Sequence, residues 1–247
     1  RKRFPYIMVS QQNTQPLMLA AGVAVWEVWC KQSDIRPGWL AGHSLGEYTA
    51  LVCSGVLGFE DAVKLVEARA RFMQEGVPAG VGAMAAILGL DDDKVTSICC
   101  EVAGAEIVAA VNFNSPGQVV IAGHKAAVER AAEAAKTAGA KRAVLLPVSV
   151  PSHCALMQPA ADKLDDLMQN TAFSAPKIQL IHNVDVEFHA TPESIRKALK
   201  EQLYKPVRWV ESVTKMHNKA VTLFVECGPG RVLTGLDKRT AKDAEHL

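Results

Sequence analysis

The segment Ala41–Glu47, with the sequence Ala-Gly-His-Ser-Leu-Gly-Glu, constrains the fold more than any other part of this chain. It places Ser44 two residues after one glycine and two residues before another. The apolar run at 37–41 is typical of a buried strand, and residues 47–54 are typical of a short helix. A strand, a sharp turn and a helix in this order predict a nucleophile elbow, in which small neighbours allow a strained serine backbone to expose its hydroxyl. The alternative is a serine in a glycine-bracketed turn without chemistry.

Composition argues against several classes of function. The 247 residues contain 27 Lys and Arg against 26 Asp and Glu, and a net charge of +1 provides no general attraction for nucleic acid or an anionic membrane. The six cysteines show neither a C-x-x-C pair nor zinc-type spacing, so we expect reduced thiols and no metal site. We see no secretory signal and no apolar run of about 18 residues. We therefore expect a cytoplasmic protein that binds neither nucleic acid nor membrane.

Hydrophobic periodicity predicts the order of helices and strands. Helices are expected at 15–29 and 59–74, on either side of the elbow. The pattern then changes to strand, helix, strand, strand, helix, strand, expected at 83–90, 91–103, 106–112, 118–122, 125–138 and 142–146. Helices and strands alternate again at 159–168, 178–183, 192–203, 207–217 and 221–226, and a last helix follows Gly228-Pro229-Gly230.

This order predicts an α/β fold with two parts. The elbow and the flanking helices indicate an α/β-hydrolase-like core with a parallel sheet, made from residues 1–80 and 149–247. The middle segment, 81–148, has the β-α-β-β-α-β order of a ferredoxin-like subdomain and is inserted into that core.

A serine hydroxyl acts as a nucleophile only with a base within hydrogen-bond reach. Of the seven histidines, His43 adjoins Ser44, and adjacent side chains diverge across an elbow; His246 lies in a charged tail. His153 follows a strand-like run and the break at Pro151-Ser152, where α/β enzymes present catalytic groups. His153 is therefore the candidate base. The alternative is a loop histidine whose ring is satisfied by the backbone.

Arg69 lies on the apolar face of the helix expected at 59–74. It stands three residues after Val66 and three before Phe72, so its side chain should face inward, whereas Arg71 should face water. A guanidinium withdrawn from water is seldom left unpaired, because burying its charge alone costs several kcal/mol. Three explanations stay open: an internal acid, a substrate carboxylate, or a stem that passes its neighbours and reaches water.

Five motifs together resemble the malonyl-CoA:acyl carrier protein transacylase family, in the family's order and over nearly the whole chain. The discrete bacterial enzyme of type II fatty acid synthesis is more similar than a polyketide synthase domain, because Ser152 stands where malonyl-selective polyketide domains carry a bulky aromatic. The motifs are Gly-His-Ser-Leu-Gly-Glu, Val66-Glu67-Ala68-Arg69, Asn112-Phe113-Asn114-Ser115-Pro116-Gly117-Gln118, Pro151-Ser152-His153-Cys154 and Gly228-Pro229-Gly230.

The resemblance implies a ping-pong malonyl transfer from malonyl-CoA to the phosphopantetheine thiol of acyl carrier protein, without a cofactor. It implies that Ser44 and His153 react, that Arg69 holds the malonyl carboxylate, and that the backbone amide of Leu45 is an oxyanion donor. It further implies that the carbonyl of Gln202 orients His153, and that Gln15, Asn114 and Ser152 line the pocket.

Family members begin with a strand and a Phe-Pro-Gly-Gln-Gly-Ser-Gln loop that supplies a second oxyanion donor. No such motif precedes Gln15 in this sequence, so the resemblance is to an N-terminally shortened member. Loss of one oxyanion donor typically costs about a hundredfold or more in rate.

The carrier protein is typically acidic, and Lys141 and Arg142 are candidates for a local docking patch. The alternative is a pair of solvated charges at the start of a strand. The chain is expected to be a monomer. The alternative to malonyl transfer is a serine esterase or thioesterase built on the same elbow, and Arg69 discriminates between them, because a hydrolase of apolar esters has no use for a buried cation.

Overall fold

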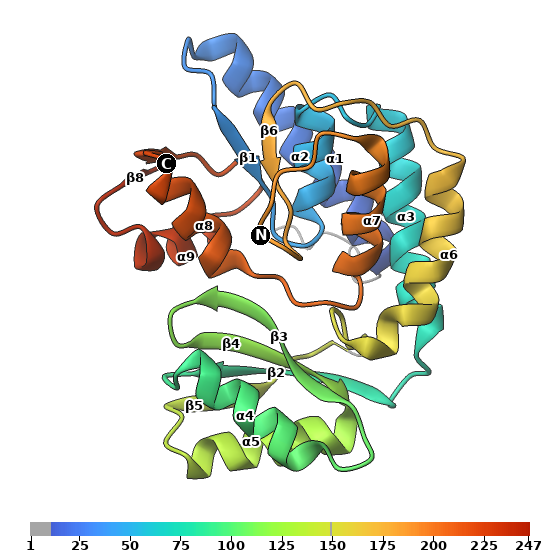
Figure 1. The fold of residues 1–247 in the computed structure, drawn as a ribbon, viewed down its shortest axis with the longest axis vertical. Helices are drawn as coiled ribbons and strands as arrows, with labels where there is room; N and C mark the ends of the chain where they lie inside the picture. The colour runs from blue at the N-terminus through green and yellow to red at the C-terminus, as the bar shows by residue number, and fades with distance from the viewer. Residues whose placement is uncertain (1–10, 149) are drawn as a thin grey trace, which may run out of the picture.

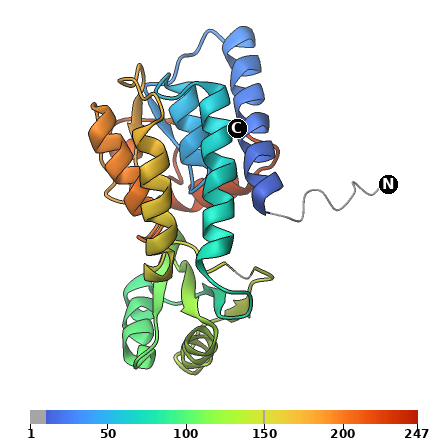
Figure 2. The same cartoon turned by 90° about the vertical axis from the view of Figure 1, so that its right-hand side faces the viewer.

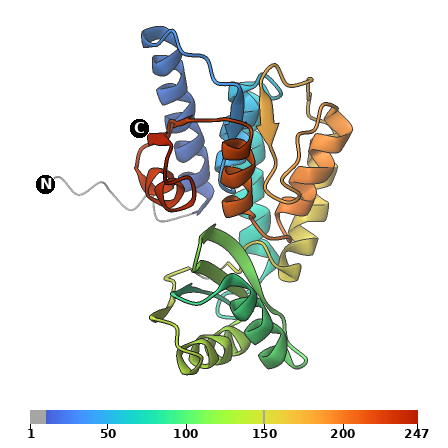
Figure 3. The same ribbon diagram turned by 60° about the vertical axis from the view of Figure 1, so that its left-hand side comes forward.

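The computed structural model describes residues 11–148 and 150–247, in two parts that lie one above the other in Figure 1. The upper part is rich in helices and contains a short parallel strand pair. The lower part is an antiparallel sheet with two helices on its outer face, as Figure 3 shows from another side. Both parts have their own apolar core.

The upper part is built around two short parallel strands that pair residue for residue, from Trp39 with Gln179 to Ala41 with Ile181. Helices pack on this pair because their apolar faces share one large core. Figure 2 shows α1, α3 and α6 running side by side. The elements are α1 (Gln11–Gln32), β1 (Trp39–Ala41), α2 (Gly46–Cys53), α3 (Phe59–Gly76), α6 (Gln158–Gln169), β6 (Gln179–Ile181) and α7 (Pro192–Gln202).

The lower part is a four-stranded sheet in the order β3-β4-β2-β5, in which every neighbouring pair is antiparallel. Residues alternate between its faces: Ile87 and Ile121 pack against the helices, while Met84 and Val120 face the upper part with Cys154. Asp91 caps α4, since its side chain accepts from the backbone N–H of Asp93. The elements are β2 (Gly82–Leu88), α4 (Asp92–Ala103), β3 (Val108–Ser115), β4 (Gln118–His124), α5 (Lys125–Thr137) and β5 (Arg142–Leu145).

A third, smaller core lies beside β1 and is formed by the C-terminal segment. Its buried residues include Trp209 and Val213. Its elements are α8 (Trp209–Asn218), β7 (Leu223–Phe224), α9 (Val232–Thr240) and β8 (Glu245–His246), and β7 pairs with β8 in parallel.

The two main parts are tied together where β3 meets the segment before α8. Val207 donates to the carbonyl of Val111 (2.8 Å) and accepts from the N–H of Phe113 (3.0 Å). These bonds hold Asn112 beside the upper part. In the region that the structure describes, no helix combines the length and the apolar character needed to cross a membrane.

The expected mixture of helices and strands is confirmed, as are the elements' order and approximate positions, but several boundaries differ. The strand expected at 221–226 is only Leu223–Phe224, and that expected at 37–41 is only Trp39–Ala41. The strand expected at 106–112 begins at Val108 and continues through Ser115, with register shifts against β4. The parallel strands among the described residues form two separate pairs rather than one sheet.

Candidate active site

Ser44 lies in a sharp turn between β1 and α2. Its φ is +52°, in the left-handed region that a side chain normally avoids. The turn is closed by bonds from the N–H of Gly46 to the carbonyl of His43 (2.9 Å) and from the N–H of Glu47 to that of Ser44 (3.1 Å). A Cβ on Gly42 would overlap the Gly46 carbonyl, so the approach requires glycine. This is the local geometry of a nucleophile elbow.

The imidazole of His153 lies against the hydroxyl of Ser44. The Oγ of Ser44 is 2.8 Å from Nε2 of His153, and Nδ1 is 2.6 Å from the carbonyl oxygen of Gln202. A carbonyl only accepts, so Nδ1 carries the proton and Nε2 is left to accept from Ser44. His153 also has a positive φ (+64°), and its N–H donates to the carbonyl of Leu203 (2.9 Å). The backbone thus presets the tautomer that a general base requires.

Burial and the nearby charge of Arg69 lower the pKa of His153 to about 3. Burial is the larger cause, because it disfavours the charged imidazolium. His153 is therefore neutral at physiological pH and able to take a proton.

This shift predicts an unusual pH dependence. A general base acts only when unprotonated, so the kcat/KM for acylation should stay level as the pH falls through 6.5, the ordinary histidine value, instead of halving there. The free energy of unfolding, in contrast, should depend on pH. The imidazole of the unfolded chain takes up a proton below 6.5 while the native one does not, so His153 lowers the free energy of unfolding as the pH falls toward 3. Acylation rates and urea midpoints between about pH 8 and pH 5 measure both effects. A drop in kcat/KM centred near 6.5 would contradict the assignment.

Arg69 faces inward, as the helix periodicity predicts, and is 1% exposed. Its Nη1 donates to Oε1 of Gln15 (2.8 Å), and its Nη2 donates to Oγ of Ser44 (3.1 Å) and Oε1 of Gln202 (3.2 Å). The guanidinium also lies 5.6 Å from the centre of the Tyr48 ring. No acid pairs with Arg69 among the residues that the structure describes. Arg71 faces water beside Glu67, as expected.

These side chains line a cleft of about 410 Å³ between the two main parts of the chain. Helices α1 and α3 supply one wall, and β2 and β3 supply another through Met84 and Asn112. The residues that line it are Thr14, Gln15, His43, Ser44, Leu45, Arg69, Met73, Met84, Asn112, Ser152 and His153.

The remaining sequence candidates are placed as follows. Leu45 is at the start of α2, directly after Ser44, and Ser152 lines the cleft beside His153. Asn114 is outside the cleft, where its Oδ1 accepts from Nε2 of His43 (2.8 Å). Lys141 and Arg142 are exposed at the start of β5 and do not line the cleft.

A group of buried polar side chains beneath the elbow was not predicted. Asn183 accepts from the N–H of Ser44 (2.7 Å), and the Gln202 side chain donates to the carbonyl of Ser44 (3.0 Å). Both also contact the buried carboxylate of Glu47. One signal was available, since Asn183 is the last residue of the strand expected at 178–183, and the carboxyl ends of parallel strands are the usual place for site residues.

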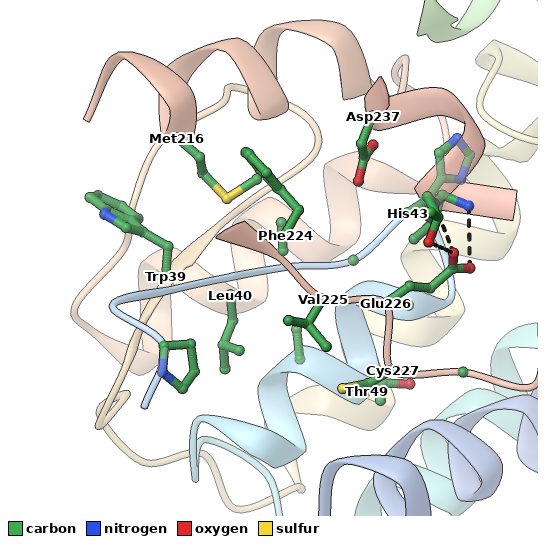
Figure 4. Close-up of a pocket in the computed structure, with 18 of the residues that line it drawn as sticks. Trp39, Leu40, His43, Thr49, Met216, Phe224, Val225, Glu226, Cys227 and Asp237 are labelled. Atoms are coloured by element: carbon green, nitrogen blue, oxygen red, sulfur yellow. Dashed lines mark hydrogen bonds between the residues drawn. The ribbon is translucent and has the colours of Figure 1, made fainter. Parts of the chain in front are cut away.

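A second cavity, of about 940 Å³, lies beside β1 (Figure 4). Its labelled lining residues come from β1, α2, α8, α9, and β7 with the segment after it, and include Leu40, Phe224 and Val225. His43 reaches it, but Ser44, His153 and Arg69 are not among its lining residues. The candidate nucleophile and base, Ser44 and His153, therefore line the smaller cleft.

A strained serine at an elbow, held against a neutral imidazole that a carbonyl orients, is typical of enzymes that work through an acyl-serine intermediate. Comparison with known proteins narrows this class, since residues 7–247 match the acyl transferase domain family. The chain belongs to the malonyl CoA-acyl carrier protein transacylase family. It is 58% identical over 227 residues to the member from Escherichia coli K12, covering 92% of this chain and 74% of that one.

Solved structures agree with this assignment. The malonyl CoA-acyl carrier protein transacylase of Coxiella burnetii has a TM-score of 0.96 at 50% identity, covering 97% of this chain and 76% of that one. A malonyl-transacylase solved in complex with a type II PKS acyl-carrier protein has a TM-score of 0.95 at 53% identity, covering 97% of this chain and 78% of that one.

Proposed function

We propose that the chain transfers the malonyl group from malonyl-CoA to the phosphopantetheine thiol of acyl carrier protein through a malonyl-serine, and so supplies fatty acid elongation. The observation that carries this proposal is the contact of Ser44 with both His153 and Arg69 in one cleft. The base accounts for nucleophilic attack, and the buried guanidinium accounts for a substrate that carries a carboxylate at its far end.

The first half-reaction forms the serine ester. Oγ of Ser44 attacks the thioester carbonyl while Nε2 of His153 takes the hydroxyl proton. The backbone N–H of Leu45, at the start of α2, stabilises the negative oxygen of the tetrahedral intermediate. The C–S bond then breaks, and the CoA sulfur leaves with the proton from His153.

Arg69 holds the malonyl carboxylate during both halves. Nη2 donates to the hydroxyl of Ser44, whose oxygen becomes an ester oxygen after acylation and is then a weaker acceptor. Gln15 and Gln202 keep the guanidinium in place through Nη1 and Nη2. The planar fork then offers both η nitrogens to the two carboxylate oxygens.

The second half-reaction reverses the first. The carrier's thiol loses its proton to His153 and attacks the ester carbonyl, and Ser44 regains the proton as its bond to the acyl group breaks. Ser152 lines the proposed pocket directly, whereas Asn114 contributes only through its bond to His43, which is a lining residue.

The proposal includes a division of the chain into two domains. Residues 1–80 and 149–247 form an α/β-hydrolase-like core, and residues 81–148 form the inserted ferredoxin-like subdomain. Support comes from the elbow in the first and from the β-α-β-β-α-β order of the second. A monomer in the cytoplasm remains the expectation from the sequence.

Intact mass measurement after mixing with malonyl-CoA tests the proposed function. A covalent gain of one malonyl group, absent from Ser44→Ala and transferred on addition of holo acyl carrier protein, is the expected result. Rapid release of free malonate without transfer would indicate a hydrolase instead. No adduct and no turnover would refute the proposal.

Docking of the carrier gives a separate prediction. Lys141→Glu reverses one charge of the exposed pair at the start of β5, so the KM for an acidic carrier protein should rise several-fold at low salt, while the KM for malonyl-CoA stays unchanged. Lys94→Glu, an exposed charge on α4, is the matched control. Equal carrier KM values for the two variants would exclude this docking position.

A further inference from the structure

The proposed mechanism leaves a buried carboxylate without a role. Glu47 lies in the first turn of α2, three residues after Ser44, and is 0% exposed. It accepts from three donors: Nδ1 of His182 (2.7 Å), the N–H of Asn183 (3.0 Å) and Nε2 of Gln202 (2.9 Å). It does not line the cleft. The start of a helix favours an acidic residue, but burying a carboxylate costs free energy unless hydrogen-bond donors replace the water that it loses.

Two of these partners hold the nucleophile. The side chain of Asn183 accepts from the N–H of Ser44 (2.7 Å) and donates to the carbonyl of Gly42 (2.8 Å). Nε2 of Gln202, besides its bond to Glu47, donates to the carbonyl of Ser44 (3.0 Å). Asn183 and Gln202 therefore hydrogen-bond the peptide groups on both sides of the strained serine, and both residues also hydrogen-bond Glu47.

Gln202 also reaches the other two reacting groups. Its carbonyl oxygen accepts from Nδ1 of His153, and its Oε1 accepts from Nη2 of Arg69. A carboxylate accepts and a guanidinium donates, so only one orientation of the amide between them satisfies both. The NH₂ of Gln202 must face Glu47, and its oxygen must face Arg69. The acceptor at residue 47 thus determines which atom of the Gln202 amide faces Arg69.

We propose that Glu47 is a positioning residue for acyl transfer: its carboxylate fixes the orientation of the Gln202 amide and the elbow peptide groups, and so keeps the guanidinium of Arg69 aligned with Ser44. The inference rests on the proposed malonyl transfer. Glu47 itself touches no reacting atom.

Glu47→Gln tests the proposal because it keeps the size of the side chain and replaces one acceptor oxygen with a donor. In one rotamer the new NH₂ opposes two fixed donors, the N–H of Asn183 and Nε2 of Gln202, and reversal of Gln202 to relieve this would point its NH₂ at Arg69. In the other rotamer the NH₂ faces Nδ1 of His182, which accepts it only if the imidazole changes to its other tautomer. The malonyl kcat/KM should fall about a hundredfold, the effect of displacing reacting groups by about 1 Å. The acetyl kcat/KM should fall much less, so the ratio of malonyl to acetyl transfer decreases.

Two further variants separate positioning from stability. Gln202→Met removes the amide but leaves the main-chain carbonyl that orients His153, and it should lower the same ratio. Leu51→Ala, at a fully buried position of α2 outside the polar group, should lower the melting temperature without changing the ratio. If Glu47→Gln does not fold, Gln202→Met decides.

A native malonyl to acetyl ratio in Glu47→Gln or Gln202→Met overturns the proposal, and so does a change in melting temperature alone. Labelling of Ser44 by a fluorophosphonate provides a readout that does not depend on malonyl transfer. If the native chain forms no malonyl adduct, the proposed function fails, but slower labelling of Glu47→Gln still supports positioning, and equal labelling rejects it.

Discussion

Replacing His153 with alanine is expected to slow the formation of malonyl-Ser44 by about 10³- to 10⁴-fold, in the upper range for loss of a general base. The reason is geometric and electrostatic together. Nε2 is 2.8 Å from the hydroxyl, and the pKa of about 3 keeps it unprotonated. Without it, the hydroxyl proton has no acceptor in the attack. Rapid-quench mass spectrometry of the acyl-enzyme measures this rate directly.

His217→Ala is the matched control for this variant. His217 is half-buried and contacts Asp243, but it does not line the cleft, so its removal should leave acylation within a few-fold of the native rate. Ser44→Ala defines the floor at which no adduct forms. An acylation rate for His153→Ala within tenfold of native would show that His153 is not the base.

Replacing Arg69 with alanine is expected to shift the substrate preference from malonyl-CoA toward acetyl-CoA. Loss of the buried partner of a carboxylate costs about 2–4 kcal/mol, or about 30- to 1000-fold in the malonyl kcat/KM. Acetyl-CoA, which has no carboxylate, should be accepted better than by the native chain, because the space and the charge no longer exclude a methyl group. Arg69→Lys keeps the charge without the fork and should recover only part of the loss.

Arg71→Ala is the control for helix α3. Arg71 is two residues away and exposed, and it contacts Glu67 and the ring of Phe72 without lining the cleft, so its removal should change both kcat/KM values little. An unchanged preference for malonyl in Arg69→Ala would reject the anchoring role. Competition between the two thioesters in one mixture measures the preference without separate enzyme concentrations.

Helices and strands could be predicted from the sequence wherever a segment shows a regular pattern of apolar residues. The long helix Phe59–Gly76 has a regular apolar face, and the β-α-β-β-α-β order could be recognised from alternation and turn residues. Strand lengths were not predictable, because a strand extends only as far as its partner. The sequence did not predict that β7 pairs with β8. The paired residues of β7 are Leu223 and Phe224, so this strand has two residues.

The site was predictable to a similar extent. Ser44, His153, Arg69, Gln15 and Ser152 were all named from the sequence, and the structure brings them into one cleft. Glu47, His182 and Asn183 were not: their contacts join distant segments, and only the place of Asn183 at the end of an expected strand offered a signal. Asn114 shows the limit of a motif: it is only two residues from Asn112, yet contacts His43 outside the cleft.

The cleft takes its reacting groups from one part of the chain and a share of its shape from another. Ser44, His153 and Arg69 come from the helix-rich part, whereas Met84 and Asn112 belong to the antiparallel sheet. Substitutions in that sheet can therefore widen or narrow the space for an acyl group while the reaction steps stay intact. Substitutions confined to the sheet could therefore change which acyl donor the cleft accepts. The choice of acyl donor can evolve more easily than the reaction itself.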